Sequence, residues 1–173
     1  MTGGSGSGKS AFAERVAAAL SRERTYVATM AATGAEARQR IERHRRQRAH
    51  LGFTTLECPD TLAGVPASPG VTLVDDLGNL CANALFAPDG TMAPVRAVRD
   101  RLVAEFEALC RRSAHVVVVS VEAGCAGRPT DAGTAAWTWL NGAVAAELGA
   151  RLDVVCELSS GIPLVLKGDL PCL

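Results

Sequence analysis

The sequence predicts an α/β fold: a single P-loop NTPase-like (RecA-like) domain over residues 1–173, with a mostly parallel sheet flanked by helices and a C-terminal β-hairpin. Short apolar runs alternate with helical patterns along the chain, and strands separated by helices favour parallel pairing. Residues 3–10 fit the phosphate-loop pattern G-x-x-x-x-G-K-[ST] and lead directly into a helical pattern. A chain of 173 residues is long enough for one domain with a sizeable core.

The order of the expected elements supports this fold class. Strands are expected at 25–29, 71–74, 115–121, 152–158 and 162–167, and helices directly after the loop and at about 34–50, 77–87, 92–112 and 131–150. The run 115–121 consists largely of β-branched residues, which is typical of a buried strand. A turn signal at 159–161 precedes 162–167, and together they predict the hairpin. Pro163 indicates a sheet edge, because proline donates no backbone hydrogen bond.

Composition and charge exclude several classes of protein. The net formal charge is zero, which argues against nucleic acid or an anionic membrane as a partner. The polar, glycine-rich start does not resemble a signal peptide, and no apolar run approaches the roughly 20 residues of a membrane helix. Six cysteines without C-x-x-C spacing are typical of reduced thiols. We therefore expect a cytoplasmic protein that does not insert into membranes.

The glycine-rich segment at 3–10 carries the strongest signal for function. Its residues are Gly3, Gly4, Ser5, Gly6, Ser7, Gly8, Lys9 and Ser10. Glycines let the backbone wrap around a phosphate with its N–H groups pointing inward, and the helix that follows adds its positive end. Lys9 is expected to contact the β- and γ-phosphates, and the Ser10 hydroxyl to bind Mg²⁺. The alternative is a flexible Gly/Ser leader with no ligand.

A second candidate element is the apolar strand that ends in two aspartates. The sequence VTLVDD places Asp75 and Asp76 at the end of the strand 71–74. In phosphate-loop enzymes an acid at this position holds Mg²⁺, directly or through water. We select Asp75 for this role, with Asp76 as the alternative. An ordinary strand that ends in a turn is the other interpretation.

The stretch TGAEARQRIERHRRQR predicts a helix with a histidine between two arginines. Thr33 and Glu36 have capping-box spacing, so the helix is expected to begin there. Arg40, His44 and Arg48 are four residues apart and share one helix face. The guanidinium groups would hold triphosphate oxygens and keep the imidazole neutral and nucleophilic. The alternative is a solvated basic helix with an incidental histidine.

With these elements in place, the chain resembles the adenosylcobinamide kinase/adenosylcobinamide-phosphate guanylyltransferase family of cobalamin biosynthesis. The matching pieces, in order, are GGSGSGKS, YVAT, RIERHRRQR, TTLECP, LVDDLGNLCANALF, VVVVSVEAG and GIPLVLK. They span nearly the whole chain. The combination of YVAT with R-I-x-x-H-R-x-x-R is specific, whereas the phosphate loop alone is shared by many proteins.

The resemblance implies two reactions. ATP or GTP would phosphorylate the hydroxyl of adenosylcobinamide, and a histidine would then take GMP from GTP and pass it to adenosylcobinamide-phosphate. The family's guanylylated histidine corresponds to His44, its phosphate loop to residues 3–10, and its Mg²⁺-binding acid to Asp75. The resemblance also implies a homotrimer. The corrinoid substrate rests on resemblance alone.

The chain departs from the family pattern in three places. Family members have a short apolar strand before the loop, where this chain has only Met1 and Thr2, and we expect the natural start to lie upstream or the sequence to be truncated. Val121 replaces a usual asparagine, and the stretch 135–145 lacks the arginines, the aspartate and the late asparagine of the usual pattern. Ala49 and Phe53 replace a usual proline and tryptophan. Two alternatives therefore stay open: a phosphate-loop kinase of another small alcohol, and a degenerate, non-catalytic nucleotide-binding paralogue.

Overall fold

The protein is built around a four-stranded parallel sheet with the strand order β2-β1-β3-β4. Its computed structural model describes residues 1–31, 39, 42, 46, 49–122, 129 and 131–172. The strands of this sheet are β1 (Arg24–Ala28), β2 (Phe53–Glu57), β3 (Ser68–Asp75) and β4 (Ser113–Val118). A separate antiparallel hairpin pairs β5 (Val155–Ser159) with β6 (Ile162–Lys167). The predicted α/β fold with a parallel sheet and a C-terminal hairpin is confirmed.

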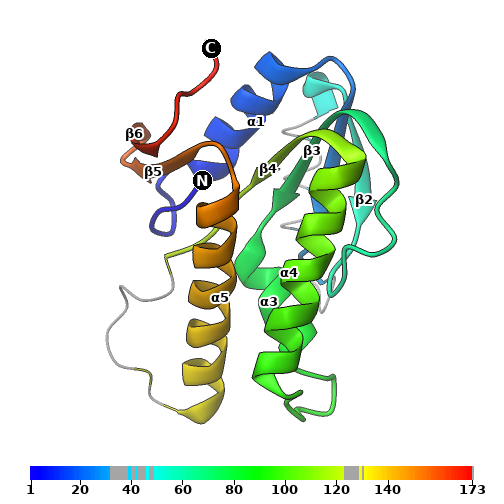
Figure 1. The fold of residues 1–173 in the computed structure, drawn as a ribbon, viewed down its shortest axis with the longest axis vertical. Coiled ribbons are helices and arrows are strands. Elements are labelled where there is room, and N and C mark those ends of the chain that lie inside the picture. The colour runs from blue at the N-terminus through cyan, green and yellow to red at the C-terminus, as the bar shows by residue number, and fades with distance from the viewer. Residues whose placement is uncertain are drawn as a thin grey trace.

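Helices cover both faces of the four-stranded sheet (Figure 1). The helices are α1 (Lys9–Leu20), α3 (Leu77–Leu85), α4 (Val95–Arg112) and α5 (Ala132–Arg151), with a 3₁₀ turn, η1 (Ala49–Leu51). Because strand side chains alternate between faces, Leu73 packs in the apolar cluster of α1, and Val74 packs in that of α3, α4 and α5. The core therefore consists of two apolar layers, one on each side of the sheet.

The sequence and the structure differ at several element boundaries. The strand β2 was not expected, because its sequence FTTLE alternates partly buried and exposed residues at the sheet edge and contains no continuous apolar run. The third strand begins at Ser68 rather than at residue 71. The fourth ends at Val118 rather than at 121, and the next carbonyl, that of Val119, accepts the Leu77 amide of α3 at 2.8 Å. Helix α3 thus begins where β4 leaves the ladder.

The first two residues connect the two sheets. Thr2 forms a parallel bridge with Glu157, in which its amide donates to the Cys156 carbonyl and its own carbonyl accepts from the Leu158 amide, both at 2.9 Å. On the other side, the Met1 carbonyl accepts from the Ser120 amide at 2.8 Å. The backbone groups that a first strand would pair with are therefore partly satisfied by Met1 and Thr2.

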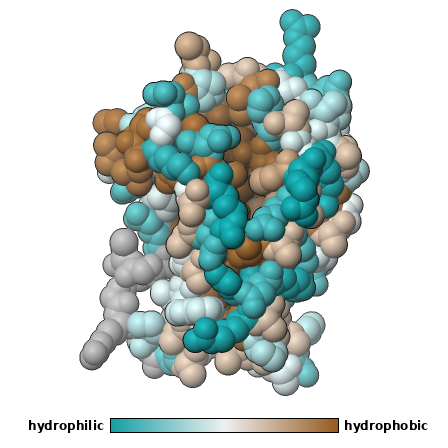
Figure 2. Space-filling model, viewed as in Figure 1, coloured by the Kyte–Doolittle hydropathy of each residue, from teal (hydrophilic) through white to brown (hydrophobic). Residues whose placement is uncertain are grey.

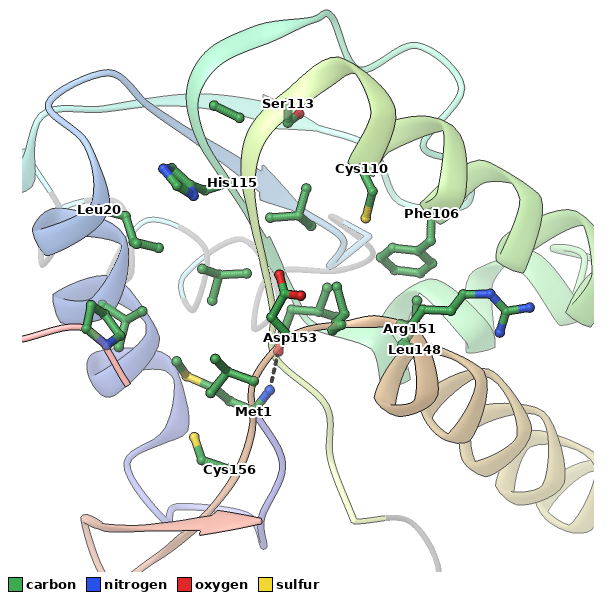
Figure 3. A pocket seen from close by; sticks show the side chains of 18 of the residues that line it. Met1, Leu20, Phe106, Cys110, Ser113, His115, Leu148, Arg151, Asp153 and Cys156 are labelled. Carbon is green, nitrogen blue, oxygen red and sulfur yellow. Dashed lines mark hydrogen bonds between the residues drawn. The ribbon is translucent and has the colours of Figure 1, made fainter. Parts of the chain in front are cut away.

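A cavity of ≈ 590 Å³ lies ahead of Met1, between β4 and β5 (Figure 3). Its apolar lining comes from α1, α4, α5, the two strands and the C-terminal segment, and charged residues also line it: Glu107, Arg111, Arg151, Asp153 and Asp169. The Met1 α-amino group donates to the Val118 carbonyl at 2.6 Å, and burial lowers the pKa of this amino group. By strand alternation, the Val116 carbonyl and the Val118 amide also face this side of β4. The cavity thus has the apolar walls and backbone edges that accept an extended segment.

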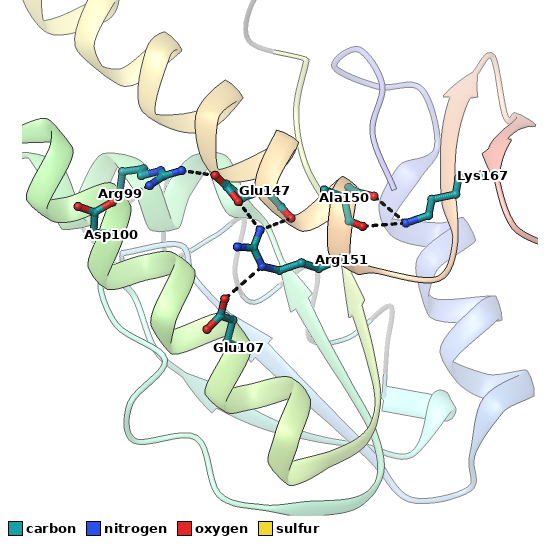
Figure 4. A network of polar contacts seen from close by, with 8 residues as sticks. Arg99, Asp100, Glu107, Glu147, Ala150, Arg151 and Lys167 are labelled. Carbon is teal, nitrogen blue, oxygen red and sulfur yellow. Dashed lines mark hydrogen bonds and ion pairs between the residues drawn. The ribbon is translucent and has the colours of Figure 1, made fainter.

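Polar contacts tie the helical face together (Figure 4). Arg99 of α4 contacts Glu147 of α5, and Arg151 contacts both Glu147 and Glu107. These pairs are partly exposed, so each contributes little to stability on its own. Lys167 of β6 donates to three carbonyl oxygens at the end of α5, at 2.6, 3.0 and 3.1 Å. A cation at this end of a helix is favourable and anchors the hairpin to α5.

The outer strand of the hairpin is apolar and exposed (Figure 2). Ile162 is 70% exposed, and Leu164 and Leu166 are each 57% exposed. Because they alternate along β6, these three side chains lie on one face of the hairpin. Among the residues that the structure describes, no helix is both long and apolar enough to span a bilayer.

We expect a short apolar segment added ahead of Met1 to stabilise the protein. A Val-Leu-Val extension would bury apolar side chains and pair with β4 and β5, raising the melting temperature by at least about 4 °C. Differential scanning calorimetry measures the change, with a Gly-Ser-Gly extension as the control of equal length. Equal melting temperatures for the two extended proteins would show that the cavity does not accept a strand.

Candidate functional site

The glycine-rich loop leads into a helix, as predicted, and it follows an isolated strand bridge that was not predicted. It leaves the bridge at Thr2 and enters α1 at Lys9. Gly3 is buried at φ 144°, and a Cβ there would lie 2.5 Å from the Leu158 carbonyl oxygen. Gly8 has φ 90° at the N-cap of α1. Both positions require glycine, one for space and conformation and the other for conformation.

The interior of the loop has the donors that a phosphate needs. Gly8 provides no side-chain cap for α1, so the first amides of the helix are available to an anion. The Ser7 hydroxyl is buried and has no hydrogen-bond partner within the described part of the chain. Lys9 Nζ donates to the Gly4 carbonyl of its own loop at 2.7 Å. A buried hydroxyl without a partner fits a loop that receives a polar ligand.

The turn of the C-terminal hairpin packs directly on the loop. The Gly161 amide donates to the Ser7 carbonyl at 2.9 Å, and a Cβ at Gly8 would lie 3.4 Å from Gly161 Cα. The Glu122 amide also donates to the Gly3 carbonyl, at 3.3 Å. The turn at 159–161 is predictable from sequence, but its contact with the loop is not, because nothing local links segments that are so far apart in the chain.

Asp75 ends β3 on the sheet face that α1 covers. Its strand neighbours Leu73 and Val71, two and four residues earlier, pack in the α1 cluster. Tyr26 of β1 belongs to the same cluster, and its hydroxyl donates to Asp75 Oδ2 at 2.6 Å. The carboxylate predicted to bind Mg²⁺ is thus held near the helix that begins with Lys9 and continues with Ser10.

Asp76 serves a different purpose in the fold. Its Oδ1 accepts the Asn79 amide at 2.7 Å and so caps α3. Burial raises the pKa of this carboxyl, and the negative charge of Asp75 adds to the effect. The hydrogen bond from Asn79 and the charge of Lys9 lower the pKa in part. Lys9 is thus within electrostatic range of Asp76.

A clamp of two polar side chains holds this edge of the sheet. The buried Thr29 hydroxyl donates to the Asp76 carbonyl at 2.7 Å and accepts the Asp76 amide at 2.8 Å. Asn83 Nδ2 donates to the carbonyls of Thr29 and Pro59 at 2.9 and 3.0 Å. Sequence reasoning identified neither as a site residue, although Thr29 lies in YVAT and Asn83 in LVDDLGNLCANALF. The available signals were a polar residue at the end of an apolar run for Thr29 and a polar residue inside an otherwise apolar helical stretch for Asn83.

The divergent stretch 135–145 lies in α5 and supports the exit of β4. Trp137 Nε1 donates to the Gly78 carbonyl at 2.9 Å, and Asn141 Nδ2 donates to the Val121 carbonyl at 3.0 Å. Asn141 is 2% exposed, and its Oδ1 has no partner within the described residues. This part of α5 therefore fixes the backbone on both sides of the acidic edge.

The histidine and its flanking arginines lie outside the described residues. Arg40, His44 and Arg48 are therefore not placed relative to the loop. The neighbouring Glu42 and Arg46 are helical and exposed, and they form an ion pair at 3.0 Å with the spacing of adjacent helical turns. The helical assignment holds at these positions, and the role of His44 stays a prediction.

The chain is similar to known proteins over nearly its whole length. Residues 1–166 match the family described as cobinamide kinase / cobinamide phosphate guanyltransferase. The chain is 34% identical over 178 residues to a bifunctional adenosylcobalamin biosynthesis protein, CobP, of Pseudomonas aeruginosa. That alignment covers 98% of this chain and 96% of the relative. The matched region includes the loop, the acidic pair and the segment with His44.

The buried cap at Asp76 predicts a pH-dependent effect of removing its charge. Asp76→Asn keeps a good N-cap and removes the cost of burying a carboxylate, so it should raise the melting temperature at pH 7 by about 2–4 °C. Burial raises the pKa of the wild-type Asp76 carboxyl. As the pH falls through this raised pKa, the carboxyl becomes protonated in the folded protein, and the free-energy cost of burying its charge disappears. The difference between the two proteins should therefore shrink toward pH 4, as measured by calorimetry across this range.

Asp131→Asn provides the matched control. Asp131 caps α5 through the Thr134 amide at 2.8 Å, but it is exposed, so its replacement relieves no burial. We expect no gain in melting temperature at pH 7 for this variant. A stability difference for Asp76→Asn that grows toward low pH would contradict the raised pKa.

Proposed function

The chain belongs to the family of cobinamide kinases / cobinamide phosphate guanyltransferases, and on this basis we propose that it catalyses both reactions of that family. It phosphorylates adenosylcobinamide with ATP or GTP, and it transfers GMP from GTP to adenosylcobinamide-phosphate to give adenosyl-GDP-cobinamide. The observation that carries the proposal is the glycine-rich loop that leads into α1, with Lys9 in electrostatic range of the acidic end of β3. The relative from Pseudomonas aeruginosa, a bifunctional adenosylcobalamin biosynthesis protein, supports it.

The kinase reaction uses the loop and the carboxylate edge. The amides of residues 3–10 and the Lys9 ammonium bind the β- and γ-phosphates. The oxygen donors of Ser10 and Asp75 fit Mg²⁺, which is commonly held by one or two side chains together with phosphates and water. When bound, the ion neutralises charge that develops on the phosphoryl oxygens. Asp75 is the better candidate ligand, since the Asp76 carboxylate is occupied as a helix cap.

The transferase reaction uses His44. A neutral ring nitrogen attacks the α-phosphorus of GTP, the P–N bond forms, and the bond to the pyrophosphate oxygen breaks. A phosphate oxygen of adenosylcobinamide-phosphate then attacks the same phosphorus and releases the imidazole. Arg40 and Arg48, four residues away on either side in the sequence, bind the phosphate oxygens and keep the imidazole neutral. We place these reactions in the cytoplasm, where nucleoside triphosphates are supplied, and we propose no nucleic-acid partner.

Label transfer tests the reactions. After incubation with Mg²⁺ and α-labelled GTP, without cobinamide, the protein should carry acid-labile label, as expected for a phosphoramidate. Label in the γ position should not be retained, because it leaves with pyrophosphate. His44→Ala should abolish the labelling, and His50→Ala, at a nearby exposed histidine, should not.

Two other outcomes would contradict the proposal in different ways. Phosphoryl transfer to a small alcohol from γ-labelled GTP, without any label on the protein, would indicate a kinase that lacks the transferase reaction. Measurable GTP binding without turnover would indicate a non-catalytic nucleotide-binding paralogue. The missing arginines of 135–145 favour that second alternative, whereas the intact loop does not.

We also propose that the protein assembles as a homotrimer through its hairpin. The apolar face of β6 is exposed in the single chain, and covering such a face on association is favourable.

A double change, Leu164→Asp with Leu166→Asp, is expected to convert the trimer into monomers in size-exclusion chromatography with light scattering. Met92→Asp, at a 48% exposed apolar residue outside the hairpin, is the control. An unchanged trimer in the double variant would place the interface elsewhere.

A further inference from the structure

We propose that Tyr26 is a positioning residue that aims the Asp75 carboxylate at the magnesium ion of bound nucleotide. The proposal rests on the function inferred above, in which Asp75 is a Mg²⁺ ligand. It assigns a role to a buried tyrosine hydroxyl at the acidic edge of the sheet.

Strand register brings the two side chains together. In the parallel pairing of β1 with β3, Tyr26 is opposite Leu73, and Ala28 is opposite Asp75. Tyr26 therefore lies two residues before Ala28, the residue opposite Asp75. Side chains two residues apart on a strand share a face of the sheet, so the Tyr26 and Asp75 side chains lie on the same face. The tyrosine side chain is long enough to cover this step, and its hydroxyl donates to Asp75 Oδ2 at 2.6 Å. A shorter residue at position 26 could not make this bond.

The ring of Tyr26 is fixed by its surroundings. Tyr26 is 3% exposed and packs in the cluster that includes Phe12 and Val16 of α1. Its ring meets that of Phe53 edge to face, with centroids 5.9 Å apart and planes at 79°. Because the ring is held on these sides, the hydroxyl occupies one place. The hydrogen bond therefore orients the carboxylate rather than the ring.

The orientation of the Asp75 carboxylate matters for Mg²⁺ binding because α1 begins with the other proposed ligand, Ser10. The helix lies on the same face as Tyr26 and Asp75, and its first residues are Lys9 and Ser10. A neutral O–H donor engages Oδ2 and leaves the negative charge of the carboxylate in place. We assign Oδ1 to the metal, since a carboxylate fixed through one oxygen presents the other at a defined position. Supporting hydrogen bonds of this kind commonly orient metal ligands.

The test compares nucleotide binding with and without Mg²⁺. Isothermal titration calorimetry with a non-hydrolysable GTP analogue gives the ratio of the two affinities for the wild type, Tyr26→Phe and Asp75→Asn. Tyr26→Phe keeps the ring and removes the hydroxyl, so we expect metal-free binding to stay within about twofold. The gain from Mg²⁺ should fall by about threefold to tenfold, the usual effect of losing one hydrogen bond. Mn²⁺ binding, followed by electron paramagnetic resonance, should weaken in parallel.

Phe53→Leu is the matched control for a purely structural role. It disturbs the ring contact of Tyr26 and leaves the hydroxyl present, so it should lower the melting temperature and keep the Mg²⁺ gain. If Tyr26→Phe changes only the melting temperature while Asp75→Asn removes the Mg²⁺ gain, the positioning role is wrong and the metal role of Asp75 stands. If Asp75→Asn also keeps the gain, the proposed metal ligand is wrong, and the proposal for Tyr26 fails with it.

Discussion

The parallel pairing of β1 with β3 is the constraint on which the candidate site depends. Its register sets Ala28 opposite Asp75, so both strands end at the same edge of the sheet. There the Thr29 hydroxyl bonds the Asp76 backbone in both directions, and Asn83 ties Thr29 to the loop after β2. Helix α1 covers the adjoining face and brings its lysine into electrostatic range of the acidic pair. A one-residue slip in this pairing would turn the Tyr26 side chain to the other face and separate it from Asp75.

Two adjacent aspartates acquire different properties because the backbone places them in different surroundings. Asp75 continues the alternation of β3 and faces α1, where a tyrosine hydroxyl meets it. Asp76 leaves the strand, and its carboxylate satisfies an amide at the start of α3 that would otherwise lack a partner. One acid can therefore remain available to a ligand while the other stabilises the helix next to it. Neither role follows from residue type, since the two side chains are identical.

Local sequence signals predicted the fold class and the glycine-rich loop that leads into α1, because each depends on neighbouring residues. The loop pattern needs only glycines, a lysine and a helix that follows, and all are adjacent in the chain. The edge strand β2 was missed because FTTLE contains no long apolar run. Three contacts could not be predicted, because each depends on how distant segments pack. They are the contact of Gly161 with Ser7, the clamp at Thr29 and the hydrogen bond from Tyr26 to Asp75. The sequence indicated which side chains could act, and the tertiary structure determines which of them meet. His44 and its arginines lie outside the described residues, and their part of the site rests on sequence.

The hairpin turn on the phosphate loop has a thermodynamic consequence. The Gly161 amide donates to the Ser7 carbonyl, so the glycine-rich loop packs against the hairpin whose first strand, β5, begins at Val155. Lys167 anchors the same hairpin to the end of α5. For the proposed phosphate site, ordering of the hairpin and ordering of the loop around a bound phosphate would be coupled, and such coupling is reciprocal. A contact that rigidifies the hairpin would then lower the entropic cost of holding a nucleotide, and a bound nucleotide would favour that contact by the same free energy.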